Sequence, residues 1–268
     1  MTIPIPRDPA IDLAAVPRHW FAGSSVATAI SNGVNMLFPA GERFFVRSVH
    51  HFADRITDPT LRAQIKAFFK QEGHHARAHD RLNDVIRAHG YPIDDFLRRY
   101  ETISRWIEAR VPAKLNLAGT AAAEHFTAIL ADGAFSEGLL DELHPQMREL
   151  LAWHAAEEIE HKAVAFDVLR EIDPSYALRV AGLVYATTML GGFWLWAAVL
   201  LLRHDRMPWR DIRTQLAVLR KRDPTLRRVF AHGIRQYIRR DFHPRDNANE
   251  QLARDWFASH GLPFTEAA

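Results

Sequence analysis

Apolar residues recur along most of the chain every three to four positions, which is the period of an amphipathic helix, whereas the alternating period of a strand is not sustained anywhere. Proline and glycine interrupt this pattern, for example at Pro59 and Gly90. We therefore predict an all-α protein. The predicted helices span residues 37–56, 60–88, 94–109, 114–135 and 146–171, and an apolar segment and two or three basic amphipathic helices follow them.

The four longest of these helices predict a four-helix bundle with additional C-terminal helices. The first two form one helical hairpin, the last two form another, and a long connection from about residue 80 to 113 joins them. We divide the chain into an N-terminal extension (1–36), a metal-binding bundle (37–175), a long apolar helix (176–203) and a basic helical segment (204–268).

The composition restricts the chemistry that such a bundle can perform. Of the 268 residues, 48% are hydrophobic, which is enough for a packed core, and none is cysteine. The lack of cysteine excludes a disulfide framework, a thiolate nucleophile and a Cys-ligated zinc or iron–sulfur site. A metal must therefore be held by His, Asp and Glu. The formal net charge of +2 does not indicate a nucleic-acid partner.

Two ExxH motifs lie on long predicted helices, one from Glu72 to His75 and the other from Glu158 to His161. Positions i and i+3 share a helix face, so each pair can bind one metal ion from a single helix. The alternative is that Glu72 and Glu158 lie on solvated faces, while the histidines cap or pack. The mostly apolar residues around both glutamates argue against that alternative.

A lone glutamate interrupts the apolar stripe of the helix before each motif. Glu42 shares its face with Phe38 and Phe45, and Glu124 shares its face with Leu117. A carboxylate on a buried stripe is costly unless it is paired or bound to a metal. Each hairpin thus offers one glutamate and then one ExxH motif, and we predict a dinuclear metal site where the four helices meet.

Four Glu and two His at a bundle centre resemble the ligand set of ferritin-like di-iron carboxylate proteins. His154 lies on the same face as Glu158, four residues before it, and this triplet with His161 is similar to that of p-aminobenzoate N-oxygenase, a di-iron enzyme with an extra histidine on its fourth helix. His154 could instead hydrogen-bond to a ligand or lie on the helix surface. The resemblance implies two iron ions, or manganese, held by Glu42, Glu72, His75, Glu124, His154, Glu158 and His161.

The run from Trp153 to Asp167 (WHAAEEIEHKAVAFD) and the later Phe242-His243-Pro244 resemble a bacterial family described as predicted metal-dependent hydrolases. This resemblance extends over nearly the whole chain. It implies metal dependence, but the description by itself carries no mechanism.

The remaining polar residues carry weaker expectations. His79 lies on the face of Glu72 one turn after His75, so it could orient a ligand or simply pack. Glu157 and Glu160 flank the ligand face and are expected to be solvated or to contact the ligands. We assign no role to His50, His51, His74, His125, Asp167 and His243.

Our leading hypothesis is a di-iron oxygenase or oxidase that acts on an apolar or aromatic substrate, with Glu72, Glu158 and His154 as catalytic residues. Dioxygen would be the co-substrate, and an external reductase or ferredoxin would supply electrons, because the chain has no Gly-rich nucleotide fingerprint. The alternatives are a hydrolase in which two metal ions activate water, and a protein that stores or merely binds metal.

The segment from Val180 to Leu202 contains no charged residue and is long enough to cross a bilayer. From Arg203 onward, 14 Lys and Arg against 8 Asp and Glu give a net +6. We expect this helix to insert shallowly into a membrane surface, or to be buried in the protein or in a homodimer, rather than to cross. The proline-rich N-terminus is not a signal peptide, so we expect a cytoplasmic protein, with peripheral binding to the inner membrane as one option.

Overall fold

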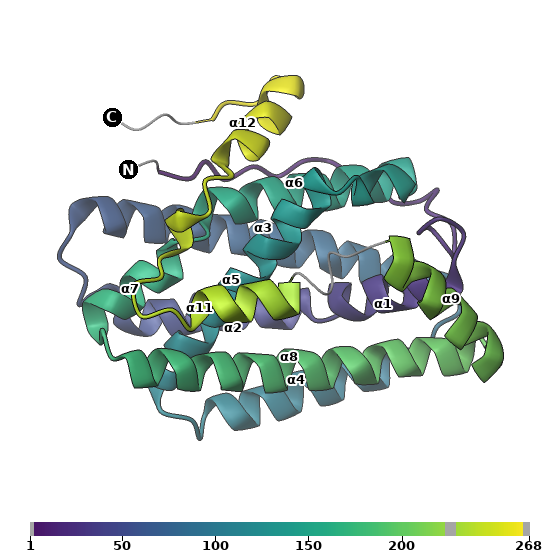
Figure 1. The fold of residues 1–268 in the computed structure, drawn as a ribbon, viewed down its shortest axis with the longest axis horizontal. Coiled ribbons are helices and arrows are strands. Elements are labelled where there is room, and N and C mark those ends of the chain that lie inside the picture. The colour runs from purple at the N-terminus through teal and green to yellow at the C-terminus, as the bar shows by residue number, and fades with distance from the viewer. Residues whose placement is uncertain (1–2, 223–228, 265–268) are drawn as a thin grey trace.

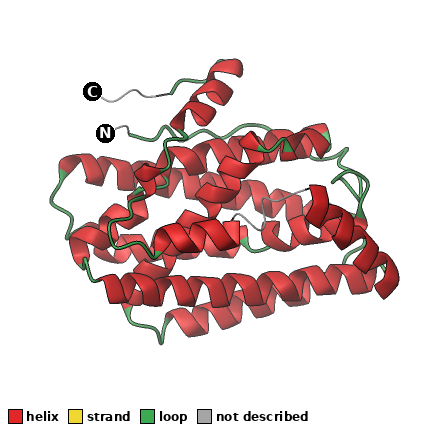
Figure 2. Cartoon of the chain, viewed as in Figure 1, coloured by secondary structure: helices red, strands yellow, loops and turns green. Residues whose placement is uncertain are grey.

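The structure is a computed structural model that describes residues 3–222 and 229–264. Within these residues the protein is all-α, as predicted; strands are absent (Figure 2), and a single β-bridge joins Phe21 to Leu143. The helices drawn in Figure 1 are α1 (Ser25–Asn35), α2 (Phe38–Ala53), α3 (Pro59–Ala88), α4 (Asp94–Glu108), α5 (Ala113–Ser136), α6 (Pro145–His161), α7 (Val164–Ile172), α8 (Tyr176–His204), α9 (Trp209–Arg222), α11 (Ile234–Tyr237) and α12 (Glu250–Ser259).

Helices α2, α3, α5 and α6 form a four-helix bundle in which each packs against two of the others. Local signals set their limits. The Asp58 carboxylate accepts the backbone N–H of Thr60 at 2.7 Å and caps α3, and Gly90, with a φ of +86°, follows the end of that helix. Proline opens α6 at Pro145. Capping side chains, proline and glycine therefore set where these helices begin and end.

The structure differs from the predicted helices in two places. The helix predicted over residues 146–171 is interrupted at Lys162 and Ala163, so α6 and α7 are separate helices. The Lys162 ammonium donates to the Asn247 carbonyl and the Asn249 side chain, both at 2.6 Å, and these tertiary contacts accompany the break. The second difference is α1, a helix inside the segment that we treated only as an extension.

Two apolar clusters fill the bundle, one at each end of a buried polar layer. On α3, Ile65 and Phe68 belong to one cluster, whereas Leu82 and Ile86 belong to the other. Glu72 lies between them and is fully buried. The same order holds on α2, α6 and α7, so the polar layer is enclosed by apolar side chains along the bundle axis.

Further helices cover the bundle from outside. Helix α8 packs along α5 and α1, and α4 lies beside α8 through the contact of Phe96 with Trp196. Helix α12 packs on α6. The N-terminal segment runs over α6 in Figure 1, close to the path of the C-terminal segment. The N-terminal segment and α12 therefore both cover the outer face of α6.

Candidate metal centre

The polar layer contains all seven side chains that the sequence suggested as ligands. Their exposed fractions lie between 0 and 4%, so the alternative of solvated glutamates was wrong. Each bundle helix contributes at the same level: Glu42 from α2, Glu72 and His75 from α3, Glu124 from α5, and His154, Glu158 and His161 from α6.

At one side of the layer, the imidazole of His161 faces three carboxylates. Its Nε2 atom lies 3.1 Å from Glu72 Oε1, 3.3 Å from Glu124 Oε2 and 3.5 Å from Glu158 Oε2. One ligand atom each of Glu72, Glu124 and His161 lies within 4.8 Å of the others, which is a spacing that one cation can bridge.

At the other side, two histidines approach the remaining carboxylates. His75 Nδ1 lies 4.0 Å from Glu72 Oε1 and 3.9 Å from Glu158 Oε1, and His154 Nε2 lies 2.8 Å from Glu158 Oε1. Two groups of side chains here could each hold a cation. One consists of His75, His154 and Glu158, and the other of Glu42, Glu72 and His75. Glu72 and Glu158 thus face both sides of the layer.

Most of the donor atoms in this layer fit a pair of metal ions because they have no hydrogen-bond partner in the described part of the protein. Among the described residues, both carboxylate oxygens of Glu42, Glu72 and Glu124 accept no hydrogen bond, and neither His75 Nδ1 nor His161 Nε2 makes one. Leaving such groups buried and unsatisfied is costly. Four ionised glutamates would balance the charge of two divalent cations, and all the ligands are oxygen or imidazole nitrogen.

Burial and neighbouring charges shift the pKa values of the ionisable side chains in this layer. Burial raises the pKa of Glu42 and Glu72 well above the ordinary range, and neighbouring carboxylates raise both further. Burial and the charge of Glu158 raise the pKa of Glu124 to about 7. Burial lowers the pKa of His161, but the carboxylates, first among them Glu158, outweigh burial and bring it well above the usual value.

The outward-facing nitrogens of two histidines are held by Glu157, which we expected to be solvated or to contact the ligands, and by Gln71, which the sequence did not single out. His75 Nε2 is hydrogen-bonded to Glu157 Oε2 at 2.9 Å, and His161 Nδ1 to Gln71 Oε1 at 3.0 Å. Each contact leaves the other ring nitrogen directed at the carboxylates. Such contacts fix the orientation and tautomer of metal-ligating histidines.

Arg7, from the N-terminal segment, joins these supporting groups. Its guanidinium lies 3.1 Å from Glu157 Oε1 and 2.9 Å from Glu160 Oε2, and Glu160 in turn accepts a hydrogen bond of 2.8 Å from Gln71. Glu157 and Glu160 therefore contact the ligand histidines or their partners and are not solvated. Nothing in the local sequence around Arg7 indicated this role, because the contact spans about 150 positions.

His79 lies next to His154, with 2.7 Å between His79 Nε2 and His154 Nδ1. It also belongs to a potential ligand group with Glu42 and His154. Burial lowers the pKa of His79 well below its usual value, as it does for His75. Of the two expectations for His79, this position fits the one in which it orients a ligand.

The other histidines lie away from the polar layer. His74 Nδ1 contacts the Arg7 carbonyl at 2.6 Å, and His125 Nε2 contacts the Gly233 carbonyl at 2.9 Å. His243 caps a short 3-10 helix (Pro244–Asp246) and pairs with Asp167 at 2.8 Å. The remaining pair, His50 and His51, is exposed on α2.

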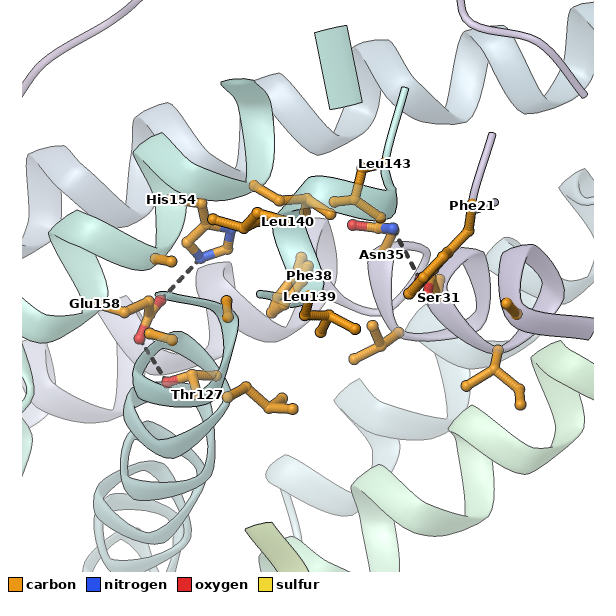
Figure 3. A pocket seen from close by; sticks show the side chains of 18 of the residues that line it. Phe21, Ser31, Asn35, Phe38, Thr127, Leu139, Leu140, Leu143, His154 and Glu158 are labelled. Atoms are coloured by element: carbon orange, nitrogen blue, oxygen red, sulfur yellow. Dashed lines mark hydrogen bonds and ion pairs between the residues drawn. The ribbon is translucent and has the colours of Figure 1, made fainter. Parts of the chain in front are cut away.

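A cavity of about 550 Å³ reaches the metal-motif side chains from one side of the bundle (Figure 3). His154 and Glu158 form its inner end, where Thr127 donates a 2.5 Å hydrogen bond to Glu158. Elsewhere its wall is apolar, apart from Ser31 and Asn35. Its remaining lining residues are Phe21, Ala27, Ile30, Val34, Phe38, Leu130, Ala131, Ala134, Leu139, Leu140, Leu143, Leu151, Ala155, Trp194, Leu216 and Leu219.

Comparison with known proteins places this architecture in a family. The family model described as predicted metal-dependent hydrolase matches residues 5–248, which include every candidate ligand and Arg7. Neither a curated protein nor a solved structure matches the chain. Because the match covers most of the chain, this protein belongs to the family of predicted metal-dependent hydrolases.

Proposed function

We propose that this protein is an enzyme that uses two metal ions, held by Glu42, Glu72, His75, Glu124, His154, Glu158 and His161, to hydrolyse a small, largely apolar substrate. The observation that carries the proposal is the set of buried carboxylate and imidazole atoms without hydrogen-bond partners. The family description supports hydrolysis as the reaction class. Bound metal ions would supply Lewis acidity and activate water.

The chain itself would supply position, orientation and a dry surrounding. Glu72 and Glu158 face both sides of the layer and are the candidates to bridge two ions. Thr127 and His154 hold the two oxygens of Glu158 in place. His154 and Glu158 also line the cavity, so a substrate bound there would lie beside these two candidate ligands.

The cavity supports the choice of substrate class. Its volume lies in the usual range for small-molecule sites, and the polar side chains of His154, Glu158 and Thr127 lie together at the inner end. An apolar or aromatic portion of the substrate would fill the outer part and place its reactive group near His154 and Glu158. Removal of water from this apolar space strengthens the electrostatic interactions at the inner end.

A second candidate function is a di-iron oxygenase or oxidase, with iron or manganese as the metal. The buried, carboxylate-rich ligand set beside a largely apolar cavity favours it, because oxygen-activating centres need protection from water. This reaction would require dioxygen and an electron donor from outside the chain. A site limited to storage or simple metal binding would need no such cavity.

One experiment separates these functions. Protein loaded with Zn²⁺, Mn²⁺ or Fe²⁺ is assayed with p-nitrophenyl esters under anaerobic conditions, and the Fe²⁺ form is also assayed for dioxygen consumption with a chemical reductant. Anaerobic turnover with Zn²⁺ or Mn²⁺ is the result expected of a hydrolase. Turnover that requires iron, dioxygen and reductant would replace hydrolysis by oxygenation, and iron loading well above two per chain would indicate storage.

Metal analysis of variants tests the site itself. Glu72→Ala and His161→Ala remove a ligand from the buried layer and should abolish metal binding while the helical content persists. Glu149→Ala is the matched control, since Glu149 is exposed on the same helix as His161. Wild-type metal content in both ligand variants would refute the assignment.

A further inference from the structure

The outer face of α8 is apolar over most of its length. Seven exposed positions follow one another at helical spacing and fall within an arc of about 80° on the helix, and none of them is charged. We call this set the α8 stripe. It consists of Ala177, Ala181, Val184, Thr188, Gly192, Leu195 and Val199.

The stripe is large for the surface of a protein surrounded only by water. Val184 is 61% exposed and Leu195 is 67% exposed, and a Cβ atom added at Gly192 would meet no other atom within 4 Å. Helix α8 is the one described helix that is long and apolar enough to span a membrane, yet only 22% of its apolar window is buried. Contiguous exposed apolar surface of this kind marks an interaction site.

The opposite face of α8 fixes the helix to the bundle, so α8 does not cross a membrane. At Gly182 an added Cβ would lie 2.4 Å from the backbone of Ala118 on α5, which shows how closely the two helices pack. Leu183, Ala186 and Ala197 are buried on the same side. In Figure 1, α8 runs parallel to the long axis of the molecule on its lower side, with α4 beside it.

Basic side chains lie at both ends of the stripe. Beyond its C-terminal end, four arginines between positions 203 and 213 are exposed and form no ion pair with any residue that the structure describes, and Trp209 in the same segment is 69% exposed. At the other end the Arg240 guanidinium lies 4.5 Å from the centre of the Tyr176 ring. The four arginines are Arg203, Arg206, Arg210 and Arg213.

We propose that the α8 stripe and these basic ends bind the surface of a membrane that contains anionic lipids. An apolar helix face with flanking arginines and an exposed tryptophan matches the acyl boundary and the headgroups of such a surface. A second copy of the chain fits less well. Parallel pairing of two α8 stripes would place the four arginines opposite each other, and antiparallel pairing would place them near Arg240, so like charges would meet in both cases. This proposal is independent of the reaction that the metal centre performs.

Vesicle flotation with the full chain tests the proposal. We compare vesicles of phosphatidylcholine alone with vesicles that also contain phosphatidylglycerol, at low and high salt. The wild-type protein should float with the anionic vesicles and less so at high salt, because salt screens the arginines. The double variant Leu195→Glu/Val199→Glu should reduce binding about tenfold or more, since it places charge in the apolar face.

Further variants test the basic ends separately from the α8 stripe. Arg206→Glu/Arg210→Glu should weaken binding to anionic vesicles, whereas Arg62→Glu/Arg81→Glu, on exposed positions of α3, should leave it unchanged. The α8 variants carry exposed substitutions, and circular dichroism verifies their fold. Equal flotation of wild type and the Leu195→Glu/Val199→Glu variant would overturn the proposal. A concentration-dependent dimer that this variant dissociates, without vesicle binding by the wild type, would assign the stripe to a second copy and also overturn it.

Discussion

Replacement of Arg7 by alanine should destabilise the protein more than any single surface substitution. Arg7 is the cation that faces two buried carboxylates, and its side chain is only 6% exposed, compared with 0% for Glu157 and 1% for Glu160. It also donates to the Pro263 carbonyl at 2.6 Å and lies 3.6 Å from the centre of the Phe257 ring. The variant loses all of these contacts at once.

The size of the effect follows from burial. Removing one partner of a buried ion pair leaves an uncompensated charge, which typically costs about 3–5 kcal/mol. Burial raises the pKa of Glu157 while Arg7 opposes that shift, so Glu157 can take up a proton in the variant and limit the loss. We therefore expect the free energy of unfolding to fall by about 3 kcal/mol, or the Tm by about 6–12 °C in a chain of this size.

The same substitution should weaken metal binding. Arg7 orients Glu157, and Glu157 holds His75 with its Nδ1 atom toward the carboxylates. Disturbing such supporting contacts usually lowers metal affinity about 10- to 100-fold. Titration with Mn²⁺, followed by calorimetry, measures this loss separately from any activity.

Thermal and urea unfolding of the metal-free protein measure the stability term, and Arg77→Ala is the control. Arg77 also links α3 to the N-terminal segment, through Asp8 at 3.2 Å, but both side chains are about half exposed. Such a pair contributes about 0–1 kcal/mol. If Arg7→Ala unfolds with the stability of Arg77→Ala and binds Mn²⁺ as the wild type does, the buried network does not support the metal centre, and the reasoning is refuted.

Three further predictions address packing, charge and the cavity. Gly182→Ala should lower the free energy of unfolding by about 2 kcal/mol or more, because its Cβ would meet the backbone of α5, whereas Gly191→Ala, with open space around it, should raise it by about 0.5–1 kcal/mol in urea unfolding. Burial raises the pKa of Asp167, but hydrogen bonds and charge from His243 and Arg245 outweigh burial and bring this pKa below 3.8. The ionised carboxylate therefore stabilises the fold above pH 3.8, and this contribution is lost as the pH falls through the lowered pKa. Asp167→Asn should therefore cost about 1–2 kcal/mol at pH 7, and in pH-dependent unfolding the difference from the wild type should vanish in strong acid. Ala134→Trp should fill part of the cavity and abolish binding of an apolar fluorescent probe while metal content stays at the wild-type level; unchanged probe binding would show that the cavity is not the binding site.

The candidate ligands could be found from the sequence because their signals are local. Glu72 and His75 share one helix face by spacing alone, and Glu42 stands out as a carboxylate within an apolar stripe. Burial of each helix face follows from the hydrophobic effect, so the position of these side chains inside the bundle was predictable once the helices were. The same regularity hid the break at Lys162, where no proline or glycine interrupts the pattern.

The supporting contacts and the cavity are decided by the tertiary structure. Arg7 meets Glu157 across 150 positions, and the cavity wall combines residues from α1, α5, α6, α8 and α9. Periodicity describes which face of a helix is buried, but not which distant segment covers it. The sequence by itself determined an all-α chain with a conspicuous set of carboxylates and histidines. Only the packing of helices against one another determined how those groups are held and which surfaces stay open, because such contacts depend on the shapes and charges of segments that lie far apart in the chain.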